Sequence, residues 1–134
     1  MEPNSQLTTL NEEALAHLII GKSIEIHKHI GPGLDRSCYL ECINFEFEQE
    51  GIEFQTDVEL DIVYKGQILE KTNSIDFIVE DSIIISVVAI EHIPESEVQR
   101  ILKIVRNNGF RLGLVINFHS TLLKNGIRRV SNNK

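Results

Sequence analysis

The chain has 134 residues, of which 42% are hydrophobic, and this length suits one domain with its own core. The longest apolar runs are far shorter than the about 18 residues of a membrane-spanning helix, so none is predicted. Residues 1–9 lack the basic and then apolar pattern of a signal peptide, and the default expectation is a cytoplasmic protein. We expect tails at residues 1–10 and 132–134 and a single domain at residues 11–131.

The formal net charge of −7 is distributed unevenly along the sequence. All 20 acidic residues lie within residues 1–97, whereas residues 98–134 carry basic residues and no acidic one. Such asymmetry fits a phosphate-binding face. It fits equally well a fold, or a dimer, in which the two segments neutralise each other. Both interpretations remain open at this point.

Two helices are predicted in the first part of the chain. The first begins near Thr9, where Thr9 and Glu12 have the spacing of a capping box, and it ends before the Gly-Pro-Gly sequence at residues 31–33. The second spans about residues 34–50 and ends at Gly51. Cys38 and Cys42 share one face of this helix, in a geometry that suits reduced thiols better than a disulfide.

The rest of the chain predicts five strands and one more helix. The turn at Lys65-Gly66 joins the first two strands, and the third is a nearly continuous β-branched run of the kind that is buried on both faces. A strand, a crossover helix and a further strand usually form a parallel unit. The expected strands are residues 54–64, 67–79, 83–90, 112–118 and 127–130, with a helix between Pro94 and Gly109. The order α-α-β-β-β-α-β-β thus predicts an α/β fold with a mixed central sheet flanked by helices.

An ordered series of motifs runs through the whole of this pattern. Its members are Ile24-Glu25-Ile26-His27-Lys28-His29-Ile30-Gly31-Pro32-Gly33-Leu34, Tyr64-Lys65-Gly66, Ile75-Asp76-Phe77-Ile78-Val79-Glu80-Asp81, and the segments 107–118 and 122–129. The series resembles the small bacterial GxxExxY proteins, a family of the PD-(D/E)XK nuclease type, over about residues 12–130. This resemblance implies a restriction-endonuclease-like core and metal-dependent cleavage of nucleic acid.

The departures from that family fall on its functional positions. In such nucleases one strand supplies an Asp, and the next supplies an acid and a Lys two residues apart on one face. Asp76 stands at the first position, but Ser86 and Val88 replace the acid and the Lys. Arg36 replaces the Glu of the motif that begins at Gly33. The resemblance therefore leaves Asp76, Glu25 and Gln99 as the candidate catalytic residues, with Asp76 as a weak candidate metal ligand.

Each remaining candidate also fits a structural role. Glu25 suits an ion pair with Lys22 or Lys28, Asp76 suits hydrogen bonds from backbone N–H groups of the turn, and Gln99 suits an exposed position on a helix. Glu91 cannot replace the missing acid on a regular strand, because it falls on the opposite face from Ser86 and Val88.

The function most consistent with these residues is a catalytically impaired nuclease-like domain that acts as a binding module and needs no cofactor. Its partner is either nucleic acid or a protein, including a second copy of the chain. The nucleic-acid contacts are expected from Arg100, Lys103, Arg106, Arg128 and Arg129. The alternative is an active endonuclease or exonuclease that uses Mg²⁺ or Mn²⁺ and a relocated acidic ligand. The sequence is also compatible with a deliberately altered variant of an active enzyme.

Overall fold

Residues 11–131 are the part of the chain that the structure, a computed structural model, describes. The expected tails at 1–10 and 132–134, and Thr9 with its predicted capping box, lie outside these residues. The elements are α2 (Glu12–Ile30), α3 (Arg36–Glu50), β1 (Phe54–Tyr64), β2 (Gln67–Val79), β3 (Ile83–Val88), α4 (Glu95–Asn108), β4 (Leu112–Asn117), the 3₁₀ helix η1 (Leu123–Gly126) and β5 (Ile127–Ser131). The predicted order of helices and strands is confirmed.

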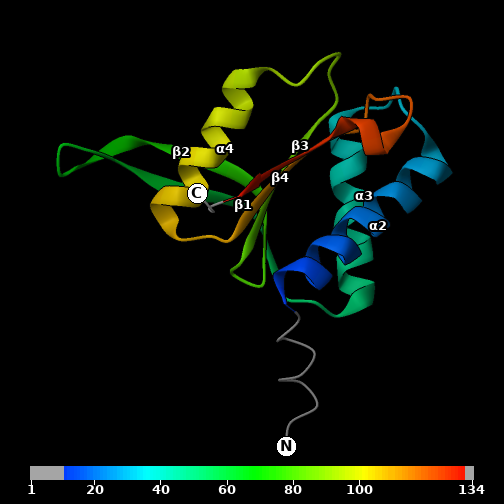
Figure 1. Ribbon diagram of the computed structural model, residues 1–134, viewed down its shortest axis with the longest axis horizontal. Helices are drawn as coiled ribbons and strands as arrows, with labels where there is room; N and C mark the ends of the chain where they lie inside the picture. The colour runs from blue at the N-terminus through cyan, green and yellow to red at the C-terminus, as the bar shows by residue number, and fades with distance from the viewer. Residues whose placement is uncertain (1–10, 132–134) are drawn as a thin grey trace, which may run out of the picture.

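The five strands form one sheet in the order β1-β2-β3-β4-β5. Strands β3 and β4 are parallel and the other neighbouring pairs are antiparallel, so the predicted mixed sheet is confirmed. Helices α2 and α3 cover one face of the sheet and α4 covers the other (Figure 1). Within residues 11–131, no helix has the length and apolar character needed to cross a membrane.

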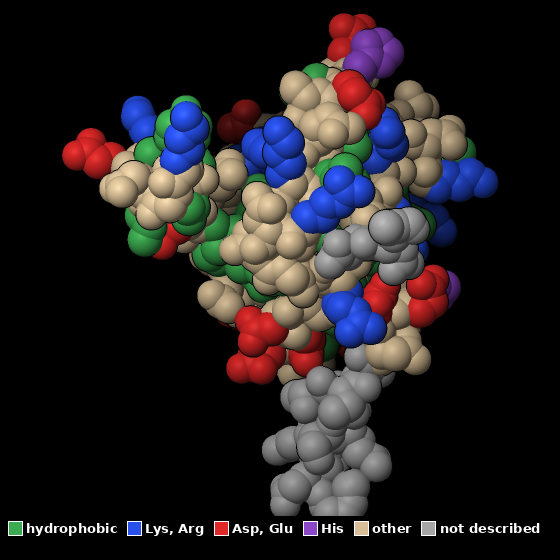
Figure 2. All heavy atoms as spheres, turned by 60° about the vertical axis from the view of Figure 1, so that its left-hand side comes forward, with side chains coloured by type: hydrophobic (Ala, Val, Ile, Leu, Met, Phe, Trp, Pro, Cys, Tyr) green, Lys and Arg blue, Asp and Glu red, His purple; other side chains and the backbone are tan. Residues whose placement is uncertain are grey.

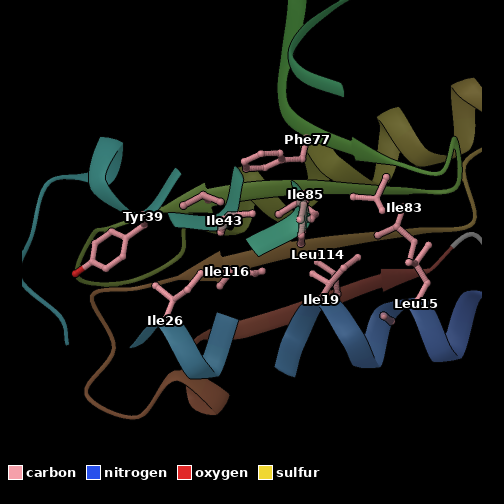
Figure 3. Close-up of a cluster of buried hydrophobic side chains, with 14 of the residues drawn as sticks. Leu15, Ile19, Ile26, Tyr39, Ile43, Phe77, Ile83, Ile85, Leu114 and Ile116 are labelled. Carbon is pink, nitrogen blue, oxygen red and sulfur yellow. The ribbon is translucent and has the colours of Figure 1, made fainter. Parts of the chain in front are cut away.

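The core has two layers because the central strands carry apolar side chains on both faces. Ile83 and Ile85 pack toward α2 and α3, as Figure 3 shows, whereas Ile84 packs toward α4. Every residue of β4 is buried, and the same alternation sends Leu114 and Val115 to opposite layers. The long apolar runs of these two strands thus have the double burial that the sequence predicts.

Several element boundaries differ from prediction, and two of these differences have clear local reasons. The first helix is capped by Asn11, whose side chain accepts a hydrogen bond from the Ala14 N–H at 2.7 Å. The third strand was expected to reach Ile90 but ends at Val88. The Asn117 side chain accepts from the Ile90 N–H at 3.2 Å and donates to the Ile90 carbonyl at 2.8 Å. These two bonds replace the strand pairing that would otherwise continue.

Strands β1 and β2 extend beyond the rest of the sheet as a two-stranded hairpin. Figure 1 shows this hairpin standing clear of the helices, and β3 pairs only with the last residues of β2. Lys65 and Gly66 form its turn with φ values of 51° and 80°, and a glycine accepts such a backbone without strain. The hairpin tip exposes several large apolar side chains, namely Val63, Tyr64, Ile68 and Leu69.

Replacing Gly113 by alanine is expected to lower the free energy of unfolding by about 1–3 kcal/mol, because it overfills the layer between β4 and α4. A Cβ atom at this position would lie 2.4 Å from Cγ2 of the buried Ile101 and 3.2 Å from Cγ2 of Val105. Urea unfolding measures the change. Gly21→Ala is the matched control: it lies within α2 with nothing within 4 Å, and it should stabilise by about 0.5–1 kcal/mol. Equal effects of the two changes would contradict the predicted clash.

Candidate active site

Asp76 lies on β2 where this strand diverges from β3. The pairing of the two strands ends at Phe77 and Ile85, so the next backbone N–H of β3 that faces β2 needs another acceptor. The Asp76 carboxylate accepts from the Val87 N–H at 2.7 Å through Oδ2. The predicted structural role of this carboxylate, as an acceptor for backbone N–H groups, is therefore present, although the donor belongs to β3 rather than to the turn.

Arg36, the first residue of α3, is the second member of the site. Its Nη2 donates to Oδ1 of Asp76, and its Nε donates to the Val87 carbonyl at 2.7 Å. Arg36 and Asp76 thus bind the two polar groups of the same residue of β3 and also bind each other. This arrangement attaches the N-terminus of α3 to the point where β2 and β3 separate.

Glu97, on the first turns of α4, lies over Ser86, the position at which the family resemblance leads us to expect an acid. The Ser86 hydroxyl donates to Oε2 of Glu97 at 2.7 Å. Arg100 binds the same carboxylate through Nε at 3.0 Å and Nη2 at 2.9 Å, and its Nη1 donates to the Ser74 carbonyl at 2.9 Å. Both oxygens of Glu97 therefore have donors, and α4 is attached to β2 and β3 together.

The two ion pairs form one electrostatic cluster, which we call the four-charge cluster: Arg36, Asp76, Glu97 and Arg100. Burial raises the pKa of Glu97, but hydrogen bonds from Arg100 and Ser86 and the attraction of Arg100 and Arg36 outweigh it and bring the pKa below its ordinary value. The hydrogen bond with Glu97, with a further contribution from the charge of Asp76, raises the pKa of Arg100. The charges of Arg36 and Asp76 therefore shift the pKa values of the other ion pair, Glu97 and Arg100.

The Glu97→Gln variant is expected to lose about 1–2 kcal/mol of stability at neutral pH, because its charge-assisted hydrogen bonds become neutral ones. The pKa of Glu97 is lowered by folding, so its contribution is complete above the ordinary glutamate pKa and disappears as the pH falls through the folded value. The stability difference between wild type and variant should therefore shrink as the pH falls below about 4.3. Urea unfolding at a series of pH values measures it.

The control for this series is Glu91→Gln. Glu91 is exposed in the loop after β3 and makes no ion pair with any described residue. Its replacement should change stability little at any pH. A Glu97→Gln effect that is constant with pH would contradict the lowered pKa.

The donor set of the cluster does not fit a hard cation such as Mg²⁺, which binds oxygen ligands in near-octahedral geometry. Both oxygens of Asp76 and both of Glu97 already accept from arginine, serine or backbone donors. Among residues 11–131, no group of three or more His, Cys, Asp or Glu side chains could hold a metal ion. Any cation at this site would first have to displace a guanidinium group.

A cleft of about 720 Å³ opens beside Asp76, between α3 and the hairpin. Asp57 lines it from β1, at the register position opposite Asp76, with a φ of 56°. Glu41 lines it from α3, so three carboxylates and the one guanidinium of Arg36 face this space. The full lining is Arg36, Ser37, Leu40, Glu41, Asn44, Thr56, Asp57, Ser74, Asp76 and Phe77.

Two of the three candidate catalytic residues are not brought to the cluster. Glu25 is exposed on α2 and pairs with Lys22 at 3.6 Å, which is one of the structural roles considered for it. Gln99 is exposed on α4, and its side chain donates to Glu95 at 3.4 Å. Asp76 alone remains in place. The residues that sequence reasoning did not assign to the site are Glu97, together with Arg36 and Arg100 in the pairing roles they have here.

The five basic residues proposed for nucleic-acid contacts do not form one face. Arg100 belongs to the four-charge cluster. Arg128 and Arg129 are adjacent on β5 and point to opposite faces, toward Glu95 at 3.8 Å and Glu13 at 3.2 Å. Lys103 and Arg106 are exposed on α4 and form no ion pair within the described part of the chain. These two remain available for an anionic partner.

The chain matches the family model of the PD-(D/E)XK nuclease superfamily over residues 13–130. No curated protein and no solved structure matches it. The matched range contains every strand of the sheet up to Val130, both helices that border the four-charge cluster, and Asp76 itself. The fold and this match together show that the chain belongs to the PD-(D/E)XK nuclease superfamily.

Proposed function

We propose that this protein is a nuclease-fold domain of the GxxExxY type that does not cleave nucleic acid and instead binds it. The observation that carries the proposal is the ion pair between Arg36 and Asp76. Arg36 stands where the GxxExxY motif has a Glu, so the residue that departs from the motif is the one that occupies the carboxylate. A Glu at this position would repel Asp76, whereas Arg36 neutralises it.

The loss of the catalytic Lys follows the same logic. A lysine at position 88 would supply a cation that could bind a phosphate or orient the attacking water. The valine that stands there can do neither. The cations near the cluster, Arg36 and Arg100, both hold carboxylates. These ion pairs, in which each carboxylate is balanced by an arginine, stabilise the junction of α3, α4 and the sheet. They leave no carboxylate in the cluster free to act as an acid or a base.

The nucleic-acid part of the proposal rests on the α4 side of the molecule. A groove of about 560 Å³ lies between α4 and the hairpin, and its polar lining is Lys103, Asn107 and Asn108 of α4, Asn73 of β2 and Asp61 of β1. Arg106 lies one turn further along α4. Figure 2 shows Lys and Arg side chains spread over this side of the molecule and on the protruding hairpin. The amide groups of this groove suit the base edges of a single strand, and Lys103 and Arg106 on α4 suit its phosphates.

Binding of labelled single-stranded DNA and RNA, followed by fluorescence anisotropy at several salt concentrations, tests the nucleic-acid proposal. The affinity should fall with salt, and Lys103→Gln/Arg106→Gln should weaken binding about tenfold and flatten the salt dependence. The matched control is Lys28→Gln/Lys124→Gln, which removes two exposed charges on the side of α2 and η1. Equal losses in both double variants would indicate non-specific attraction and contradict the proposed groove.

Calorimetry with Mg²⁺ and Mn²⁺ tests the absence of cleavage chemistry. We expect no binding in the micromolar range for the wild type or for Asp76→Ala. Micromolar binding by the wild type that vanishes in Asp76→Ala would overturn the proposal, and cleavage assays on single-stranded and double-stranded substrates would then follow.

A second candidate function is that of an active metal-dependent nuclease with a relocated acid, and the position of Glu97 favours it. Its carboxylate lies 2.7 Å from the Ser86 hydroxyl, close to the position of the missing acid, although it comes from α4 and not from β3. This function requires Arg36 to leave Asp76. Cleavage that is abolished by both Asp76→Asn and Glu97→Gln, and is increased by Arg36→Gln, would establish it.

A further inference from the structure

A second surface, remote from the α4 groove, lies between α2 and α3 on the opposite face of the sheet (Figure 1). A groove of about 550 Å³ runs between these two helices. Its apolar wall is formed by Ile26, Ile30, Leu34, Cys38, Cys42 and Phe45.

The apolar residues of this groove are exposed to an unusual degree. Phe45 is 57% exposed, Leu34 is 45% exposed and Ile30 is 37% exposed. The core does not need them, because Ile43 and Phe47 of α3 already fill the space against the sheet. Single exposed apolar side chains are common, but three large ones along one groove are typical of a binding surface.

The rim of the groove is acidic. Glu41 and Glu46 line it together with His29, and Glu48 is exposed on α3 about one helical turn after Phe45. Lys22 pairs with Glu46 at 3.4 Å, but Glu41 and Glu48 have no ion pair among the described residues. The only basic residue of α3, Arg36, is bound to Asp76. A partner for this groove therefore needs apolar side chains with positive charges beside them.

A second copy of the chain meets this requirement poorly, because its apolar hairpin tip carries Asp61 and Glu70 as well as Lys65 and Lys71 and so has no net positive charge. A two-fold contact through the groove would place Glu41 and Glu48 of one copy against the acidic rim of the other. The basic exposed face of α4 offers charge, but none of the large exposed apolar side chains lies on that helix. Nucleic acid would be repelled by the same glutamates.

We propose that the α2–α3 groove is a docking site for a basic amphipathic helix of a protein partner. A helix of this kind places apolar residues at i, i+3, i+4 and i+7 in a groove and carries Lys or Arg along both sides of that stripe. The apolar stripe would contact Leu34 and Phe45, and the flanking cations would face Glu41 and Glu48. This inference does not depend on whether the four-charge cluster cleaves nucleic acid, because the two surfaces are separate.

The test uses two synthetic helical peptides of about 18 residues, both with leucine at the stripe positions and with either lysine or glutamate at the flanks. Titration into the full-length protein should show binding of the lysine peptide at least about tenfold tighter than binding of the glutamate peptide. Phe45→Ser should weaken binding of the lysine peptide about tenfold, and Glu41→Gln/Glu48→Gln should reduce its salt dependence.

Ile68→Ser is the matched control, since Ile68 is 67% exposed on the hairpin and lies outside the groove. It should bind the lysine peptide like the wild type, and urea unfolding should show that the Phe45→Ser variant remains folded. Equal binding of the two peptides, or equal losses in Phe45→Ser and Ile68→Ser, would overturn the proposal. A concentration-dependent dimer that Phe45→Ser abolishes, seen by sedimentation velocity, would assign the groove to a second copy and would also overturn it.

Discussion

The Tyr39→Ala variant is expected to lose about 3–5 kcal/mol of stability, a large part of what a domain of this size has. The Tyr39 side chain is fully buried, and its ring stacks on Phe118 with centroids 4.4 Å apart and an interplanar angle of 12°. Alanine would leave a cavity between α3 and the end of β4 and would remove the stacking contact. Urea unfolding measures the loss directly.

The hydroxyl of Tyr39 has a separate role in the turn between α2 and α3. It donates to the Gly31 carbonyl at 2.6 Å and accepts from the Leu34 N–H at 3.2 Å. Tyr39→Phe keeps the ring and should cost only about 1–2 kcal/mol, because it removes the two hydrogen bonds of the hydroxyl but none of the ring packing. A Tyr39→Phe loss as large as the Tyr39→Ala loss would assign the main effect to the turn and contradict the packing argument.

The contacts of Tyr39 also give a structural reason for the spacing of Gly33, Arg36 and Tyr39, the three positions that correspond to the GxxExxY motif. Gly33 has a φ of 100° in the turn, Arg36 opens α3 beside Asp76, and Tyr39 reaches back to the turn from one helical turn later. Two of the three residues therefore shape the connection between the helices. Only Arg36, the middle position, faces the carboxylate of Asp76, and it is the position at which the chain departs from the GxxExxY motif that it resembles.

The strands could be predicted because their signals are local. Turn residues at Lys65-Gly66 and the apolar run at 83–88 depend on nearby chemistry and on burial, and the bounds of β1 and β2 match prediction. The site could be predicted only in part. Strand alternation correctly puts Ser86 and Val88 on one face of the strand, but it does not say which helix covers this face or which residue of α4 lies above Ser86, since this depends on how the helix sits on the sheet. The i, i+3 spacing of Glu97 and Arg100 was the one feature of the sequence that could have predicted their ion pair.

The uneven distribution of charge along the sequence has two explanations, and only the structure separates them. Arg111 pairs with Glu12 at 3.3 Å and Arg129 with Glu13 at 3.2 Å, so part of the basic segment neutralises the acidic one within the chain. These pairs join residues about a hundred positions apart, and no local pattern predicts them. Lys103 and Arg106 are left on α4, which is why the nucleic-acid proposal rests on this helix and not on the whole basic segment.

Introducing an acid and a lysine at the positions where PD-(D/E)XK nucleases carry them, with Ser86→Glu/Val88→Lys, is expected to lower stability by about 3–5 kcal/mol at neutral pH without metal. Ser86 is 3% exposed, and its hydroxyl donates to Glu97. A carboxylate there would lose this donor and would meet the charge of Glu97. A lysine at position 88 would disturb the apolar layer under α4, against which Val88 packs.

The pH dependence and the response to Mg²⁺ separate charge from simple overpacking. If charge dominates, the double variant should regain stability relative to wild type as the pH falls and the added carboxylate is protonated. Ser86→Gln/Val88→Met, of similar size without the charges, should be less destabilising and should show no such recovery. Unchanged or improved stability of the double variant would contradict the view that Ser86 and Val88 relieve a buried charge cluster. Stabilisation of the double variant by Mg²⁺, with no effect on the wild type, would mean that the scaffold keeps the geometry of a metal site and that these two positions, with Arg36, prevent its use.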